Sequence, residues 1–302
     1  MLFMIIVMRQ VLQLILFAAV GYILCKSGKA KSEHTKLLSS LQVYLFLPCN
    51  IINTYSANFT VAYISEKYPL LLASFIIMGV MIFIADLFAK MLVEKSYQQS
   101  VYRYSLTVSN YGFFGYPLVS GLFDDLMLQN AMIFALPISM YTYTMGYAML
   151  TKTKFSLKGL FNPVITASFI GAIIGLFGLK LPYTLGSLVE KSSACMAPIA
   201  MLLAGMVISE FDFFSLLKVK NNNIVSFMRL LVIPCAIAGS LKVLGFEDII
   251  LPALMMHAMP CGLNTIVFPR LVGEDCRPGA SLALISSLLA CITIPICVTI
   301  FT

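Results

Sequence analysis

The sequence is poor in charged residues and has no tryptophan. Asp, Glu, Lys and Arg make up 11% of its 302 residues, whereas apolar residues make up 60% and the mean hydropathy is +0.94. Soluble globular proteins carry about a quarter charged residues, so this composition excludes a soluble domain as the main body of the protein. At about 20 residues for each membrane-spanning helix, the chain has room for about ten spans and for no large extramembrane domain.

The sequence also lacks the patterns typical of enzymes, metal sites and nucleic-acid-binding proteins. It contains no HExxH, Gly-x-Ser-x-Gly or GxxxxGK motif, and no histidine, cysteine and carboxylate group at metal-ligand spacing. The eight cysteines include no Cys-x-x-Cys pair and are interpreted as small core residues. No basic run is interleaved with aromatic residues, despite the net charge of +7. We therefore expect no enzymatic activity, no cofactor or metal and no nucleic-acid partner.

Apolar runs separated by polar residues predict ten spans. They cover about residues 5–25, 37–56, 68–92, 101–122 and 129–150 in the first half, and about 162–179, 186–209, 223–244, 249–271 and 279–301 in the second. The first run has no basic leader and no cleavage site, so we expect it to remain as a span.

The distribution of basic residues orients these spans. With an extracytoplasmic N-terminus, 15 of the 20 Lys and Arg residues fall on the cytoplasmic side, as the positive-inside rule requires. They are Lys26, Lys29, Lys31, Lys36, Lys90, Lys95, Arg103, Lys152, Lys154, Lys158, Lys218, Lys220, Arg229, Arg270 and Arg277. We therefore expect a multi-pass protein of the plasma or inner membrane with both termini outside the cytoplasm.

The fourth and ninth spans each contain a glycine and proline interruption. Span 4 reads SLTVSNYGFFGYPLVSG over residues 105–121, and span 9 reads HAMPCGLNTIVFPRLVG over residues 257–273. Each half has five spans, and an odd number inverts the second half relative to the first. Spans 2 and 7 each carry one internal proline, Pro48 and Pro198.

The predicted fold is therefore an all-α polytopic membrane protein of ten helices. Residues 1–150 form the first five-helix repeat, residues 151–161 a short cytoplasmic linker, and residues 162–302 the inverted second repeat. The broken helices 4 and 9 are expected to cross, because interrupted segments in equivalent positions of two repeats point to a binding site at the membrane midplane.

The two interruptions are the predicted binding site for an anion. Proline lacks an amide hydrogen, and glycine lowers the cost of non-helical backbone, so each helix should break there. Unpaired backbone groups are tolerated in a membrane only where they line a cavity or meet protein, and half-helix N-termini attract negative charge. The predicted substrate-binding residues are Asn110, Gly112, Gly115, Tyr116, Pro117, Pro260, Gly262, Asn264 and Thr265, with Pro48, Asn53, Pro198 and Tyr141 on neighbouring spans. The alternative is that the interruptions are packing kinks.

Three ionisable residues are candidates for coupling or gating. Asp86 lies one turn from Lys90, so it is either a coupling residue or half of an interfacial ion pair. His257 precedes the ninth-span interruption and is either a proton sensor or a neutral core histidine. Arg270 is either a topology anchor or a gate that attracts anions.

Two further patterns concern packing. Tyr141, Tyr143 and Tyr147 repeat along the fifth span, and they either direct hydroxyls towards a cavity or fill the core. Gly171 and Gly175 have the GxxxG spacing, which favours close packing of helices.

Several pieces of the sequence resemble the auxin efflux carrier family. The strongest are SNYGFFGYPL at residues 109–118, AMPCGLNTIVF at 258–268 and ITIPI at 292–296. LFLPCNII at residues 45–52 and APIAMLLAG at 197–205 resemble the second and seventh spans of the family. Their order over nearly the whole chain carries the resemblance.

The resemblance implies a scaffold of helices 1, 2, 6 and 7 and a transport domain of helices 3–5 and 8–10, with the substrate beside the crossing helices. It places Asn110 and Pro117 at the family's asparagine and crossover-proline positions, and Pro260 at the proline that opens the motif of helix 9. Plant members have a further proline where this sequence has Thr265, and many have a long central loop where it has only residues 151–161. A compact microbial-type carrier is therefore expected.

The function expected from the resemblance and the predicted site is secondary transport of a small organic anion, an auxin-like indole carboxylate or a dicarboxylate, by alternating access. One alternative is a sodium-coupled symporter resembling bile-acid carriers, and another is a ligand-sensing membrane protein that transports nothing. The expected partners are the anion and membrane lipid, and the resemblance adds a homodimer as a common assembly of the family.

Overall fold

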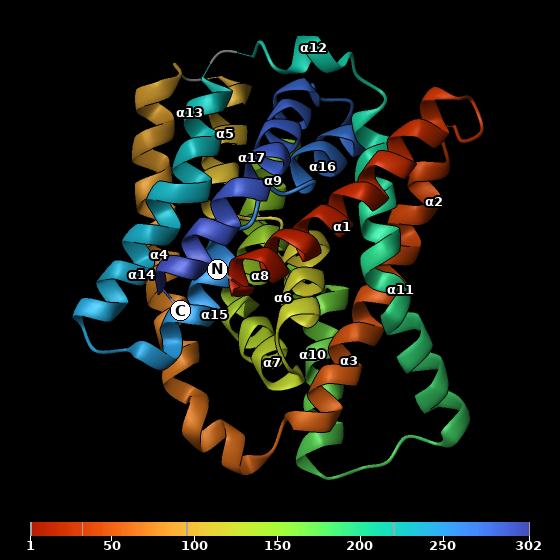
Figure 1. The fold of residues 1–302 in the computed structure, drawn as a ribbon, viewed down its shortest axis with the longest axis vertical. Coiled ribbons are helices and arrows are strands. Elements are labelled where there is room, and N and C mark those ends of the chain that lie inside the picture. Colours follow the sequence, from red (N-terminus) through yellow and green to blue (C-terminus); the bar gives the residue numbers. More distant parts are fainter. Residues whose placement is uncertain (1, 32, 95, 220, 302) are drawn as a thin grey trace.

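The protein is built from helices, as the computed structural model describes for residues 2–31, 33–94, 96–219 and 221–301 (Figure 1). Six helical stretches in this part of the chain are long and apolar enough to cross a bilayer. They are Ile5–Lys26, Glu33–Asn58, Val61–Leu92, Tyr183–Ile208, Asn222–Val243 and Arg277–Phe301. The expected all-α membrane fold is therefore confirmed, whereas the inverted repeat of ten helices stays a prediction.

Four predicted spans correspond to single long helices. These are α1 (Leu2–Lys26), α4 (Val61–Leu92), α11 (Tyr183–Ile208) and α17 (Arg277–Phe301). A fifth, α10 (Pro163–Leu176), is apolar but shorter. Asn162 is its N-cap, and the side-chain oxygen of Asn162 accepts hydrogen bonds from the amides of Val164 and Ile165. Pro163, the first residue of the helix, has no amide hydrogen to satisfy.

A π-helical turn precedes a proline in three helical segments. The turns η1 (Gln42–Phe46), η2 (Tyr111–Gly115) and η5 (Met228–Val232) lead into α3 (Leu47–Asn58), α6 (Tyr116–Leu122) and α14 (Ile233–Val243), whose first turns contain Pro48, Pro117 and Pro234. A proline ring clashes with the carbonyl group four residues earlier, and the wider turn accommodates the ring without ending the helix. Pro117 therefore does not mark the place where its segment breaks.

The segments that hold the predicted fourth and ninth spans are interrupted. Residues 108–110, here called the first interruption, separate α5 (Tyr97–Thr107) from η2. Residues 258–263, the second interruption, separate α15 (Glu247–His257) from α16 (Asn264–Val272). The remaining short elements are α2 (Glu33–Leu41), α7 (Asp125–Phe134), α8 (Leu136–Tyr141), η3 (Thr142–Gly146), α9 (Tyr147–Thr151), η4 (Leu157–Leu160), α12 (Phe213–Leu216) and α13 (Asn222–Phe227).

Close packing at glycines joins α1 to α11 and α10 to α3. A Cβ atom on Gly205 of α11 would overlap the carbonyl oxygen of Ala18 of α1. A Cβ atom on Gly171 would stand 2.8 Å from Cβ of Tyr55, and one on Gly175 would stand 2.7 Å from the carbonyl oxygen of Phe59. The GxxxG pair therefore lies in a tight contact between α10 and α3, as expected for small residues at helix interfaces in membranes.

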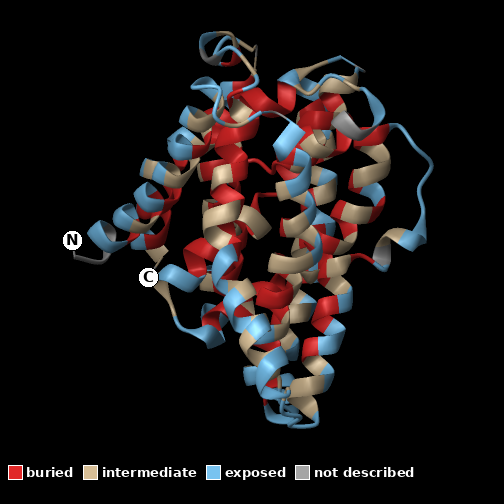
Figure 2. Cartoon of the chain, turned by 90° about the vertical axis from the view of Figure 1, so that its right-hand side faces the viewer, coloured by how far each residue is buried: buried red, intermediate tan, exposed pale blue. Residues whose placement is uncertain are grey.

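The outer surface of the helices is largely apolar, while buried residues fill the centre (Figure 2). Large side chains such as Ile76 on α4 and Phe169 on α10 are each 67% exposed. Extended apolar surface of this kind marks contact with lipid or protein.

Candidate functional site

The two interruptions lie against each other. Ser109 and Cys261 form an isolated antiparallel bridge, and the Asn110 amide donates a hydrogen bond of 2.7 Å to the carbonyl oxygen of Pro260. The Ser109 hydroxyl donates to the carbonyl oxygen of Met256, at 2.6 Å. Segments that are about 150 residues apart in the sequence thus pair their backbones within the core.

Much of the polar backbone at the interruptions is paired within the protein. The Val108 amide donates to the carbonyl oxygen of Tyr104 and the Ala258 amide to that of Leu254, so each half-helix ends with a backbone hydrogen bond. The Cys261 amide donates to the Ser286 hydroxyl oxygen on α17, at 2.9 Å. The amides of Asn110 and Cys261 are therefore engaged in the fold and are not free to bind an anion.

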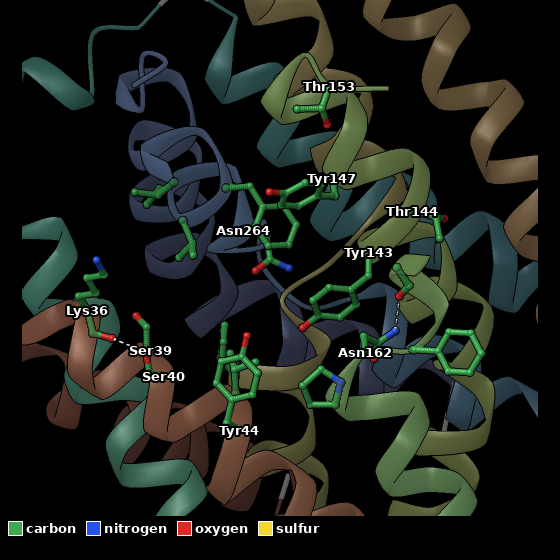
Figure 3. Close-up of a pocket in the computed structure, with 18 of the residues that line it drawn as sticks. Lys36, Ser39, Ser40, Tyr44, Tyr143, Thr144, Tyr147, Thr153, Asn162 and Asn264 are labelled. Atoms are coloured by element: carbon green, nitrogen blue, oxygen red, sulfur yellow. Dashed lines mark hydrogen bonds between the residues drawn. The ribbon is translucent and has the colours of Figure 1, made fainter. Parts of the chain in front are cut away.

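A cavity of about 1140 Å³ lies beside the second interruption. Its walls come from α2 and η1 on one side, from η3 and α9 on another, and from the start of α10 and α16. Figure 3 shows Tyr44, Tyr143 and Asn264 reaching the same space from three different segments. The cavity therefore lies where parts of the chain that are distant in sequence come together.

The charged groups around the cavity are all cationic in the described part of the chain. Lys36 on α2 and Lys154 in the linker line it, and no Asp or Glu does. Asn264, the first residue of α16, also lines it, so the partial positive charge of this helix terminus lies at the cavity wall. The described lining thus carries positive charge without a carboxylate, although both lysines are exposed to solvent.

Asn264 is held in place by the first broken segment. Its side-chain amide donates a hydrogen bond of 3.1 Å to the hydroxyl group of Tyr104 on α5, which is fully buried. An asparagine amide has two donor hydrogens and an acceptor oxygen. Asn264 can thus bind a guest through its other hydrogen while Tyr104 fixes its orientation.

Aromatic side chains form the apolar part of the cavity. Tyr147 and Phe268 meet edge to face with ring centroids 5.1 Å apart, and Tyr143 lies 6.0 Å from Phe268. Phe113, in the turn that follows the first interruption, completes this surface. Tyr143 and Tyr147 therefore face the cavity, whereas Tyr141 is buried on α8 and does not line it. The arrangement suits a molecule with an anionic group and an apolar body.

Of the residues predicted to bind substrate, only Asn264 lines this cavity in the described part of the chain. Asn53 is exposed on α3, and Pro48 and Pro198 are half-buried in their helices. Gly112 is half-buried as well. The other predicted residues are buried around the two interruptions, namely Asn110, Gly115, Tyr116, Pro117, Pro260, Gly262 and Thr265. Their assignment to a binding site stays a prediction.

Asp86 is part of an ion cluster outside the cavity lining. Its carboxylate pairs with Lys90 at 2.6 Å and also with Arg103 on α5. The side chain of Asp86 is 30% exposed, so solvent screening weakens these pairs. The cluster connects α4 to α5, the helix that precedes the first interruption.

The structure describes the side chain of His257 but not that of Arg270. His257 ends α15, is fully buried and meets Phe134 edge to face at 5.9 Å. Neither of its ring nitrogens has a hydrogen-bond partner among the described residues. Arg270 belongs to α16, but its side chain lies outside the described residues.

Arg229 is a correction to the sequence-based list of cytoplasmic residues. It was expected among the cytoplasmic basic residues, but it is fully buried in η5, and its Nη1 donates a hydrogen bond of 3.0 Å to the carbonyl oxygen of Leu106. The sequence signal that marks it is an arginine inside the apolar run 223–244. A charge within a span points to function more often than to topology.

A helical membrane protein with two paired helix interruptions and a cavity beside the second of them has the features of a membrane transport protein. The sequence profile of a family described as "Membrane transport protein" matches residues 6–154 and 149–298, which is nearly the whole chain. The chain belongs to this family, which is the auxin efflux carrier family that its motifs resemble.

Two archaeal proteins illustrate the similarity. An uncharacterised transporter of Methanocaldococcus jannaschii is 28% identical over 301 residues, covering 91% of this chain and 92% of its own length. A second such transporter, from Methanothermobacter thermautotrophicus, is 24% identical over 301 residues and covers 95% of this chain and 96% of its own. Both alignments span nearly the whole length of both chains, as expected for a compact microbial-type member of the family.

Proposed function

We propose that the protein is a secondary carrier that moves a small organic anion across the membrane by alternating access. Membership of a transporter family supports transport, and the cavity supports the substrate class. The observation that carries the proposal is the charge pattern of the cavity, where Lys36, Lys154 and the N-terminal end of α16 meet no carboxylate among the described lining residues.

The size and lining of the cavity favour a carboxylate with an apolar body. Small-molecule sites enclose about 300–1,000 Å³, so a cavity of about 1140 Å³ has room for an indole carboxylate or a dicarboxylate together with water. The anionic group would lie near Asn264, and the apolar part would pack against Tyr147 and Phe268. The two lysines would hold a second carboxylate of a dicarboxylate.

Alternating access would follow from a movement between two groups of helices. One wall of the cavity belongs to α2, η1 and the start of α10, which pack with α3 and α11. The other wall belongs to η3, α9 and α16. We infer that the first group acts as a scaffold and the second as the transport domain, within the predicted ten-helix inverted repeat with both termini outside the cytoplasm.

Counterflow in proteoliposomes tests the proposal. Liposomes preloaded with an unlabelled carboxylate should accumulate the labelled compound only when they contain the protein, and Asn264→Ala should reduce the initial rate at least about tenfold. Lys36→Ala combined with Lys154→Ala should reduce the rate most for dicarboxylates. Lys180→Ala is the matched control, because Lys180 is exposed and does not line the cavity. Saturable binding without any counterflow would instead support a ligand-sensing protein.

A further inference from the structure

The linker between the two halves of the chain exposes both basic and apolar side chains. Residues 152–161 read KTKFSLKGLF and contain no Asp or Glu. Phe155, Leu157 and Phe161 are 56%, 64% and 89% exposed, and Lys158 is exposed as well. Aromatic and aliphatic side chains combined with lysines are typical of segments at the boundary between lipid headgroups and acyl chains. The composition of the linker therefore favours contact with a membrane surface over contact with water alone.

The linker also leads directly into an apolar helix. It ends at Asn162, the N-cap of α10, and Phe169 in the middle of α10 is 67% exposed. Apolar helices with exposed side chains of this size face lipid in a membrane protein. Because only residues 152–161 separate α9 from Asn162, the linker stays close to the place where α10 enters the bilayer.

The linker is folded against the rest of the protein at both of its ends. The ammonium group of Lys152 pairs with the Glu274 carboxylate at 2.7 Å. Near the other end, a Cβ atom on Gly159 would overlap the carbonyl oxygen of Tyr143 in η3. The Asn162 side-chain amide donates a hydrogen bond of 3.0 Å to the carbonyl oxygen of Gly159. A displacement of the linker must therefore also move η3 or the start of α10.

The same linker contributes to the wall of the cavity. Its lining residues are Thr153, Lys154, Ser156, Gly159 and Phe161. Lys158 does not line the cavity, and it forms no ion pair among the described residues. The charge of Lys158 is therefore available to a partner outside the cavity, whereas Lys152 is already paired with a carboxylate.

We propose that residues 153–161 bind anionic phospholipid of the adjacent leaflet, and that this lipid holds the cavity wall in place. The phosphate-bearing headgroup pairs with Lys158, while Phe155 and Leu157 pack among the acyl chains. An anionic bilayer surface strengthens binding about fivefold for each basic residue near it. A second copy of the chain fits this surface less well, because two such segments would bring their lysines together without an intervening carboxylate.

Fluorescence quenching tests the lipid site. The chain has no tryptophan, so Phe155→Trp supplies a single fluorophore at a linker position that does not line the cavity. In phosphatidylcholine proteoliposomes, brominated phosphatidylglycerol should quench this fluorophore more strongly than the same mole fraction of brominated phosphatidylcholine. Phe169→Trp is the matched control, because it faces lipid in the middle of α10, and both lipids should quench it equally. If Phe155→Trp does not fold, Leu157→Trp replaces it.

A second substitution assigns the preference to one charge. Adding Lys158→Ala to Phe155→Trp should lower the relative affinity for phosphatidylglycerol about fivefold. Adding Lys180→Ala should leave it unchanged, because Lys180 is exposed beyond the other end of α10. Equal quenching by the two lipids, quenching by neither, or an unchanged preference after Lys158→Ala would overturn the lipid site.

Counterflow tests the link to the cavity wall, which rests on the proposed function. The wild type should transport faster in phosphatidylcholine that contains phosphatidylglycerol than in phosphatidylcholine alone, and Lys158→Ala should lose most of this difference. Soluble glycerol phosphate should not replace the lipid. Preferential quenching without any effect of the lipid on counterflow would overturn the link. If the wild type transports no carboxylate but the quenching preference holds, the proposed function fails and the lipid site stands.

Discussion

The two interruptions look alike in the sequence but differ in the structure. The first interruption is short, its Asn110 is buried, and the Asn110 amide is bound to Pro260. The second interruption is longer, and the helix that follows it begins with Asn264 at the cavity wall. The comparison teaches that the first interruption supports the second, and that α16, which follows the second, presents Asn264 to the cavity.

Contacts from the first broken segment and from α17 hold the second interruption in place. Ser109 of the first interruption binds the end of α15, and Tyr104 on the half-helix before it orients Asn264. The second interruption is in turn fixed by α17, where Ser286 binds the Cys261 amide and Gly279 lies against the first turn of α16. Substitutions at these contacts test how much each interruption contributes to stability and to ligand binding.

The largest effect is expected from Gly279→Ala. A Cβ atom at this position would overlap the carbonyl oxygen of Thr265 and would stand 2.7 Å from its hydroxyl oxygen, so α16 or α17 must shift. Overpacking of this kind costs about 1–3 kcal/mol or more. Gly112→Ala is the control in the first broken segment, because its Cβ atom would meet only a Leu47 methyl group at 4.0 Å. Thermal unfolding of both variants in detergent measures the difference, and equal Tm values would contradict the described packing.

An intermediate effect is expected from Ser286→Ala. The variant leaves the buried amide of Cys261 without its acceptor, which costs about 1–3 kcal/mol. Ser109→Ala leaves the carbonyl oxygen of Met256 without its described donor, and since an unpaired carbonyl oxygen is tolerated better than an unpaired amide, the loss is smaller, about 1 kcal/mol. Denaturation in matched detergent should therefore rank the serine of the second interruption above that of the first. The reverse order would show that the serine hydrogen bond of the first interruption contributes more to stability than that of the second.

The smallest effect is expected from Tyr104→Phe. The variant keeps the ring and loses only the hydroxyl group that accepts from Asn264. Because a neutral hydrogen bond contributes about 0.5–1.5 kcal/mol, ligand affinity should fall about two- to tenfold, with a small change in Tm. Isothermal titration calorimetry with a carboxylate that binds the wild type measures the affinity of both proteins. A loss as large as that of Asn264→Ala would mean that Tyr104 itself contacts the ligand.

Part of this architecture could be predicted from the sequence. Proline and glycine marked the two broken segments, and apolar run lengths marked the long helices, because both depend on local chemistry. The positions of the breaks could not be predicted as well. Pro117 follows a π-helical turn within a continuous stretch, and the break lies upstream at residues 108–110.

The cavity depends on tertiary packing and could not be predicted residue by residue. Lys36 and Lys154 were interpreted as topology signals, yet they line a common cavity with Asn264. Arg229 was counted as a cytoplasmic residue because charge counting does not distinguish the end of a span from its interior. The hydrogen bond to Leu106 that explains its burial joins residues 123 apart in the sequence.

The central claim is that the second interruption presents Asn264 to an anion in the cavity. A thermal-shift screen of the purified protein against carboxylates tests it most directly, because a ligand that binds only the folded state raises the Tm by mass action. We expect at least one indole carboxylate or dicarboxylate to raise the Tm of the wild type and to lose most of this effect with Asn264→Ala. An equal Tm increase in both proteins would contradict the claim.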